Sequence, residues 1–329
     1  MNSSAGTAPI TTPFDSAERD LDVMVGFDGS EHAQSALHFA AVEALSRGIG
    51  LTVVTAFSVP LMIYPNMASL PAQPEDQFRR ELAEKTLSEA RESLREYPGK
   101  AEFVTTQGDA TGALVELSAR AKLVVVGARG RGGFVGRILG SVAAALPAHA
   151  HCPTVVVPSG YQPVEAQGAE RFTHGTTDSP VVAAIDGSEQ SRMVLLTSAQ
   201  QAEHRSGKLH IFAAMPLIDE WVYWYPELYV DESSTKTRRS ELEESIEAEL
   251  SWLQELHPSV DITAEVAVGE PISLIAAKTR SSALTAIGTR GRGAVKSALL
   301  GSISRGVINN AEGPVLVVPT EAMHDVTDR

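Results

Sequence analysis

The chain has 329 residues, of which 43% are hydrophobic and 21% charged, with a formal net charge of −14 and one cysteine. No apolar run reaches the roughly 18 residues that a spanning helix needs, so we expect no membrane insertion. The negative charge argues against nucleic-acid binding, which calls for basic surfaces. One cysteine excludes an internal disulfide, which suits a cytoplasmic protein.

Strands and helices are predicted to alternate along the first half of the chain. Short apolar runs indicate strands, and apolar residues at a spacing of three or four indicate helices. The predicted strands are 22–27, 51–57, 102–106, 123–126 and 154–157. One predicted helix begins at Ser30, and the others cover 78–97, 110–121 and 141–150. The alternation predicts a doubly wound α/β domain with a five-stranded parallel sheet that is covered on both faces.

The second half repeats the first. Residues 25–31 match 183–189 at an offset of 158, and 152–158 match 313–319 at an offset of 161. We therefore expect two tandem domains of one fold, joined by a polar linker and flanked by flexible tails. The expected boundaries are 1–19 for the N-terminal tail, 20–160 for the first domain, 161–178 for the linker, 179–320 for the second domain and 321–329 for the C-terminal tail.

A glycine motif of identical spacing follows the fourth predicted strand of each half. Gly127-Ala128-Arg129-Gly130 is separated by nine residues from Gly140-Ser141, and Gly288-Thr289-Arg290-Gly291 is separated by nine residues from Gly301-Ser302. Glycines let main-chain N–H groups approach an anion, and the N-terminus of the following helix adds partial positive charge. The motif therefore predicts two phosphate sites.

Asp28 and Asp186 follow the first strand of each half, so we expect each to face the same crevice as the nearby glycine loop. In a sheet of this kind, ligands bind at the carboxyl ends of the strands, where the strand order reverses. An alternative role for both aspartates is to cap the helix that follows. The loops themselves fit neither a Walker A motif, which needs a lysine, nor a Rossmann fingerprint, whose glycines follow the first strand.

Three further features leave alternatives open. Arg129, Arg131, Arg290 and Arg292 are either phosphate contacts or solvated loop charges. The aromatic loop 221–229 is either a partner surface, a lid or packing for the next helix. The cluster His149, His151 and Cys152 becomes Asn310, Glu312 and Gly313 in the second half, so we expect no metal site made from side chains alone.

Together these motifs resemble the universal stress protein family, specifically its tandem-domain, ATP-binding branch. The resemblance covers 20–320 and rests on the Asp-Gly-Ser sequences, the glycine motifs and the ending 149–157. It implies an adenine nucleotide alpha hydrolase-like fold, one ATP per domain with Mg²⁺ on the phosphates, and backbone contacts to adenine at Ala56 and Ala214. The implied ATP-binding residues are Gly26, Asp28, Ala56, Gly127, Ala128, Arg129, Gly130, Arg131, Gly132, Gly133, Gly140, Ser141, Val142, Asp186, Ala214, Gly288, Thr289, Arg290, Gly291, Arg292, Gly293, Gly301, Ser302 and Ile303.

The second half departs from the first at one of these positions. Ala184 stands where the first half has Gly26, and we expect its methyl group to crowd the nucleoside side of the second pocket. Methyl groups at Gly127 or Gly130 are expected to take the space of a phosphate oxygen and abolish binding without unfolding the domain.

The resemblance favours a nucleotide-dependent regulatory protein of the stress response, read by an unknown protein partner. Rapid hydrolysis needs a positioned base and a charge-neutralising array, and no catalytic residue is expected. The alternative is a slow ATP hydrolase or an adenylyl-transfer enzyme of the same fold. The family pairs its last strands, so we expect 154–157 and 315–318 to pair in an internal pseudo-dimer. A homodimer through 221–229 stays open.

Overall fold

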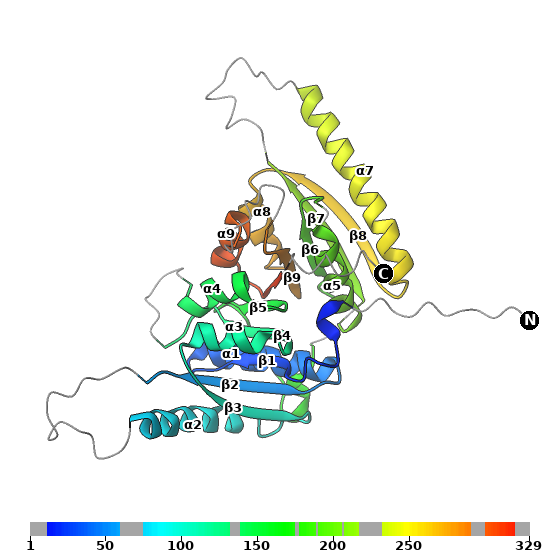
Figure 1. The fold of residues 1–329 in the computed structure, drawn as a ribbon. Coiled ribbons are helices and arrows are strands. Elements are labelled where there is room, and N and C mark those ends of the chain that lie inside the picture. The colour runs from blue at the N-terminus through cyan, green and yellow to red at the C-terminus, as the bar shows by residue number, and fades with distance from the viewer. Residues whose placement is uncertain are drawn as a thin grey trace, which may run out of the picture.

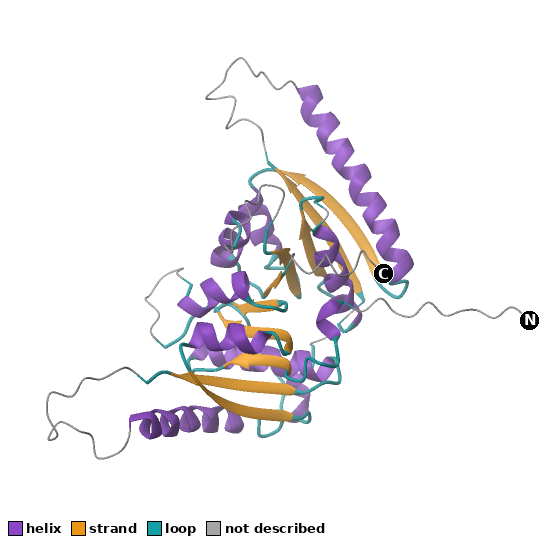
Figure 2. Ribbon diagram, in the orientation of Figure 1, coloured by secondary structure: helices purple, strands orange, loops and turns teal. Residues whose placement is uncertain are grey.

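Helices and strands alternate along both halves of the computed structural model (Figures 1 and 2). The structure describes residues 12–59, 75–131, 139–174, 178–188, 190–205, 207–216, 232–290 and 300–319. The strands are β1 (Asp22–Gly26), β2 (Leu51–Phe57), β3 (Ala101–Gln107), β4 (Ala121–Gly127), β5 (Thr154–Val157), β6 (Val181–Ile185), β7 (Lys208–Met215), β8 (Asp261–Val268), β9 (Leu284–Gly288) and β10 (Val315–Val318). The helices are α1 (Glu31–Ser46), α2 (Glu75–Ser93), α3 (Ala110–Ser118), α4 (Ser141–His149), α5 (Ser191–Glu203), α7 (Glu232–Leu256), α8 (Pro271–Lys278) and α9 (Ser302–Asn310), with short 3-10 helices η1 (Pro13–Asp15) and η3 (Gly168–Phe172).

All of these strands belong to one ten-stranded sheet of order β3-β2-β1-β4-β5-β10-β9-β6-β7-β8. Neighbouring strands within each half are parallel, which confirms the predicted α/β class. After β1 the sheet grows through β2 to β3, and the chain then returns to place β4 on the other side of β1. In the second half, β7 and β8 lie on one side of β6, and β9 lies on the other. Each half therefore has one switch point, where ligands bind in folds of this kind.

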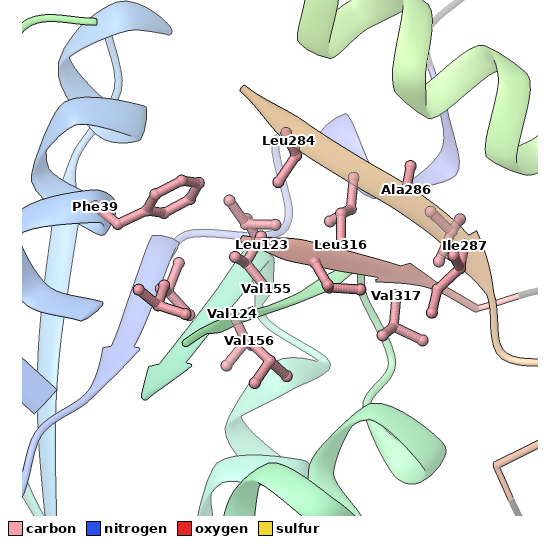
Figure 3. Packing of buried hydrophobic residues seen from close by; sticks show 14 of the residues in the cluster. Phe39, Leu123, Val124, Val155, Val156, Leu284, Ala286, Ile287, Leu316 and Val317 are labelled. Carbon is pink, nitrogen blue, oxygen red and sulfur yellow. The ribbon is translucent and has the colours of Figure 1, made fainter. Parts of the chain in front are cut away.

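The two halves join along their last strands. β5 and β10 pair antiparallel, with Val156 opposite Val315 and Thr154 opposite Val317, as the sequence led us to expect. Figure 3 shows the valines of β5 close to Leu316 and Val317 of β10. All of these side chains are buried in one hydrophobic cluster that extends through both halves. The pairing thus joins two five-stranded sheets into one, and their side chains form one continuous hydrophobic core.

A buried polar network also links α1 with the end of α5. Glu43 accepts a hydrogen bond from Arg205 of the second half and lies 3.4 Å from Arg47 of its own helix. The Gln201 amide, oriented to satisfy its hydrogen bonds, donates to Glu43 at 3.0 Å. Gln201 and Arg205 occupy the positions of Glu43 and Arg47 at the offset of 158. The network therefore joins equivalent positions of the two halves but holds one carboxylate, not two.

The linker is packed against α1, although its sequence shows no periodicity. Phe172 is buried and stacks on the His38 ring, with 5.9 Å between the ring centroids. His38 Nε2 lies 2.7 Å from the Arg171 carbonyl, and Nδ1 lies 3.0 Å from the Tyr161 hydroxyl. One histidine thus contacts both ends of 161–171. The aromatic loop 221–229 lies outside the described residues.

Part of the expected N-terminal tail is also packed. Phe14 of η1 is buried. Arg19 donates hydrogen bonds to the carbonyls of Ser118 and Ala121, which lie at the end of α3 and the start of β4. The first domain therefore includes residues N-terminal to β1.

Candidate functional site

A cavity of about 690 Å³ opens at the carboxyl ends of β1, β2 and β4, at the switch point of the first half. It brings together predicted residues from three separate stretches of sequence. Those that line it are Asp28, Ala56, Gly127, Arg129, Gly130, Arg131, Gly140, Ser141 and Val142. Gly26 and Ala128 are not among its lining residues, and Gly132 and Gly133 lie outside the described residues. The sequence motifs therefore converge on one cavity.

Asp28 connects the end of β1 to the glycine loop. One carboxylate oxygen accepts the Ser30 N–H at 3.0 Å, and the other accepts the Arg131 N–H at 2.9 Å. The cap of α1 is Ser30, whose hydroxyl oxygen accepts the Ala33 N–H at 3.2 Å. Asp28 is therefore not the helix cap that its sequence context also allowed. A Cβ on Gly130 would lie 2.5 Å from Asp28 Oδ2, so the close contact of loop and carboxylate requires glycine there.

Gly127 has a different reason to be glycine from the one expected. A Cβ on Gly127 would lie 2.5 Å from the carbonyl oxygen of His32 in α1. The missing side chain thus lets the end of β4 pack against α1, and the expectation that a methyl group there would replace a phosphate oxygen is wrong. Gly140 closes the loop, since its N–H donates to the Ala128 carbonyl at 2.9 Å.

Among the described residues, the helices after the two glycine loops begin without a side-chain cap. The N-caps of α4 and α9 are Gly140 and Gly301, which have no side chain that could accept a hydrogen bond from the first turn. α1, α3 and α8 are capped by Ser30, Asp109 and Glu270, whereas α5 also lacks such a bond. The first N–H groups of a helix have no partner within it and carry partial positive charge. The first turn of α4 lines the cavity, so these donors border a space that an anion can enter.

One wall of the cavity comes from α2, which the sequence motifs did not reveal. Arg79, Leu82, Ala83 and Thr86 line it from one face of the helix. Leu82 is 45% exposed, so part of its apolar surface is open to the cavity and to solvent. The apolar spacing predicted the helix, but its placement depends on the course of the chain after β2. The other lining residues outside the prediction are Thr55, Phe57, Ser58, Ala110, Leu139 and Ala143.

The second half has a cavity of about 90 Å³ at its own switch point. Its lining includes positions equivalent to those of the first cavity: Asp186 for Asp28, Ala214 for Ala56, Gly288 for Gly127, Arg290 for Arg129 and Ile303 for Val142. The hydrogen bond that closes the first loop also recurs in the second. Gly301 N–H donates to the Thr289 carbonyl at 2.9 Å, as Gly140 does to Ala128, and Ser302 begins α9. Gly291, Arg292 and Gly293 lie outside the described residues.

Asp186 and Ala184 distinguish the second site from the first. Asp186 accepts hydrogen bonds from the Ser188 N–H and the Ser191 hydroxyl, each at 3.0 Å. Ala184 lines the cavity beside Ile275 of α8. In the first half, a Cβ on Gly26 would lie 2.9 Å from Leu114, the residue equivalent to Ile275. The added methyl group of Ala184 thus lies where the helix after the third strand packs on the sheet.

No metal-binding cluster of side chains accompanies either cavity among the described residues. In this part of the chain, no three His, Cys, Asp or Glu side chains lie together where they could hold a metal ion. Cys152 is fully buried, and burial raises the pKa of its thiol to about 12, so the thiolate is disfavoured. Within the same residues, no helix has the length and apolar character to cross a membrane.

The fold and the paired cavities define a tandem doubly wound α/β protein with a glycine loop at each switch point. The family model described as "Universal stress protein family" matches residues 22–158 and 179–319, and the chain belongs to that family. Universal stress proteins Rv2623 and Rv2005c of Mycobacterium tuberculosis are similar over nearly their whole lengths. Rv2623 is 30% identical over 307 residues, covering 92% of this chain and 97% of the relative. Rv2005c is 31% identical over 300 residues, covering 90% and 96%.

Solved structures share the tandem fold. A universal stress protein from Archaeoglobus fulgidus matches with a TM-score of 0.61 at 20% identity, covering 92% of this chain and 99% of the other. A protein described as a putative universal stress protein from Pseudomonas aeruginosa matches with a TM-score of 0.60 at 16% identity, covering 95% and 99%. At these identities the likeness concerns the fold.

Proposed function

We propose that this universal stress protein binds one ATP in each half and acts as a nucleotide-dependent regulator of the stress response. The observation that carries the proposal is the repeated pairing of a glycine loop with a glycine-capped helix at the switch point. α4 and α9 present main-chain N–H groups that no side chain of the described residues caps. Such donors, together with the positive end of the helix, favour a phosphate group.

The first cavity fits the parts of a nucleotide. Its volume of about 690 Å³ lies within the range of small-molecule sites, whereas the described residues of the second half enclose only about 90 Å³, which is less than a nucleotide needs. Arg129 and Arg131 add positive charge beside the main-chain donors, which suits phosphates. Ala56, Phe57 and Leu82 form an apolar wall that suits a base. We therefore assign the phosphates to the loop side of the cavity and the nucleoside to the side of β2 and α2.

The residues also fit a magnesium ion held mainly by the ligand. Mg²⁺ is commonly bound through one or two carboxylates together with substrate phosphates and water. When bound with ATP, it would neutralise part of the phosphate charge. Asp28 and Asp186 are the carboxylates among the described lining residues of the two cavities, and each could assist it.

The described residues suit nucleotide binding better than turnover. No histidine or lysine is present among the described lining residues of the first cavity. Its one carboxylate, Asp28, already accepts main-chain hydrogen bonds at both oxygens. Each oxygen keeps a second acceptor position, but one carboxylate held in place by the main chain is not the charge-neutralising array that rapid hydrolysis needs. We infer that the protein holds ATP with little or no hydrolysis, and that a protein partner reads the occupied state.

The test blocks each site with a carboxylate at the start of its helix. Ser141→Glu and Ser302→Glu place a negative charge where the phosphates would lie, while an acidic residue in the first turn of a helix favours folding. Equilibrium dialysis with radiolabelled Mg-ATP should give about two ATP per chain for the wild type, about one for each variant and none for the double variant.

The neutral variants Ser141→Gln and Ser302→Gln are the matched controls and should keep most of the binding. Chromatography of the bound nucleotide after acid quenching reports ADP formation. Wild-type protein that binds no ATP would contradict the proposal. Rapid ADP release would instead establish the hydrolase alternative.

A further inference from the structure

Arg131 links the glycine loop to α2 across the end of β1. Its main-chain N–H donates to Asp28 at 2.9 Å, so the start of the residue is fixed beside the cavity. Its guanidinium extends to α2, where Nη2 lies 3.8 Å from Glu89 Oε2 and 3.5 Å from Thr86 Oγ1. Arg131 and Thr86 both line the cavity, whereas Glu89 does not. Glu89 therefore contacts the arginine without being placed to contact a ligand.

The turn after β1 leaves space for this ion pair. Gly29 has a φ of +79°, and a Cβ there would lie 2.2 Å from Arg131 Nη2 and 2.8 Å from Glu89 Oε2. A side chain at position 29 would thus displace the guanidinium or the carboxylate. The Asp28-Gly29-Ser30 turn consequently serves two partners, since Asp28 holds the loop and Gly29 accommodates the ion pair.

The contact is weak enough for a ligand to replace. The Arg131 and Glu89 side chains are 51% and 47% exposed, and ion pairs of this exposure contribute little to stability. A phosphate group accepts two parallel hydrogen bonds from a guanidinium and carries more charge than one carboxylate. Bound phosphate and Glu89 would therefore compete for the same donor.

We propose that Glu89 competes with the nucleotide phosphates for the Arg131 guanidinium and thereby lowers the affinity of the first site for polyphosphate ligands. The inference rests on the proposed nucleotide function. It makes Glu89 a specificity-determining residue that acts through Arg131. A ligand that lacks phosphate does not draw Arg131 away, so its affinity should not depend on Glu89.

The first experiment measures ATP and adenosine binding by calorimetry in the full-length Ser302→Glu protein, so that the first site alone reports. Glu89→Gln should strengthen ATP binding by roughly twofold to fivefold, the range that a half-exposed ion pair allows. Adenosine binding should not change. Glu84→Gln is the matched control, because Glu84 lies on the same helix, is 50% exposed and pairs with Arg91 instead.

A double-mutant cycle distinguishes competition for Arg131 from electrostatic repulsion of the ligand by Glu89. Arg131→Gln should weaken ATP binding, and adding Glu89→Gln to it should have no further effect, because the donor is gone. If Glu89→Gln strengthens ATP binding as much in the Arg131→Gln protein as in the starting protein, Glu89 merely repels the ligand. That result would overturn this inference but not the proposed function. Weaker ATP binding by Glu89→Gln would show that Glu89 holds Arg131 ready, which also overturns it. No ATP binding by the starting protein would overturn the inference together with the proposed function.

Discussion

Gly127 and Gly130 belong to one motif, but a methyl group would meet different neighbours at the two positions. At Gly127 it would meet the main chain of His32, which is part of α1 and cannot move without shifting the helix. At Gly130 it would meet the end of the Asp28 side chain, which can rotate. The sequence predicted that both glycines belong to the site, but it does not show which neighbour each one spares.

The two substitutions should therefore separate stability from binding. We expect Gly127→Ala to lower the free energy of unfolding by about 1 to 3 kcal/mol, the usual cost of overpacking. Gly130→Ala should leave stability nearly unchanged but weaken ATP binding at the first site, because Asp28 loses its contact with the loop. Urea unfolding and calorimetry measure the two effects. Equal losses of stability would show that both glycines serve packing alone.

Among the elements, those with strong apolar patterns were predictable and those tied down by single side chains were not. The strand predicted over 51–57 coincides with β2, and the one over 154–157 coincides with β5. The packing of the predicted linker escaped prediction, because it depends on Phe172 and on hydrogen bonds of His38, which leave no periodic pattern. The cavity wall on α2 escaped it because periodicity identifies a helix but not the neighbour that each face meets.

The linker end beside α1 should make stability depend on pH. Burial, and then the nearby Arg205, lower the pKa of His174 to about 4 from 6.5. Arg47, Glu43 and His204 are the other charged or titratable groups that act on it. Burial also lowers the pKa of His38. Below pH 6.5 the unfolded chain takes up protons that the folded chain does not, so stability is lost as the pH falls.

We expect His174 alone to cost roughly 2 kcal/mol of unfolding free energy between pH 6.5 and 5. The carboxylate of Glu43 does not offset this, because Arg205 and Arg47 lower its pKa even though burial would raise it. Urea unfolding at several pH values should give a shallower pH dependence for His174→Gln than for the wild type. The same slope in both proteins would exclude His174 as the cause.

At the scale of the whole molecule, the pairing of β5 with β10 holds the two halves together. Val156 and Val317 are buried on opposite strands of this pair. The resemblance to the family and the apolar last strands predicted the pairing, because exposed apolar strand edges favour pairing. The polar network around Glu43 was not predictable in this way, because it depends on how the buried face of α1 meets the end of α5, which no sequence pattern shows.

Replacing Val156 and Val317 with lysine should separate the halves, because two buried charges without partners are costly. Small-angle scattering should then show a larger radius of gyration, while circular dichroism should show that strands and helices remain. Ala264→Lys, on an exposed position of the edge strand β8, is the control and should keep the wild-type shape. A compact shape in the double lysine variant would contradict the strand-pairing account.

The network around Glu43 has a consequence for what fusion allows. Two identical subunits that meet about a two-fold axis must contribute the same residues twice. A pair of first halves would bring two Glu43 and two Arg47 side chains together, with opposite charges in equal number. A pair of second halves would instead bury two Arg205 guanidinium groups beside two neutral Gln201 amides. Joining the halves in one chain thus permits an asymmetric interface. The second half depends on the first for the carboxylate that neutralises Arg205, and a second copy of the same half could not supply that carboxylate.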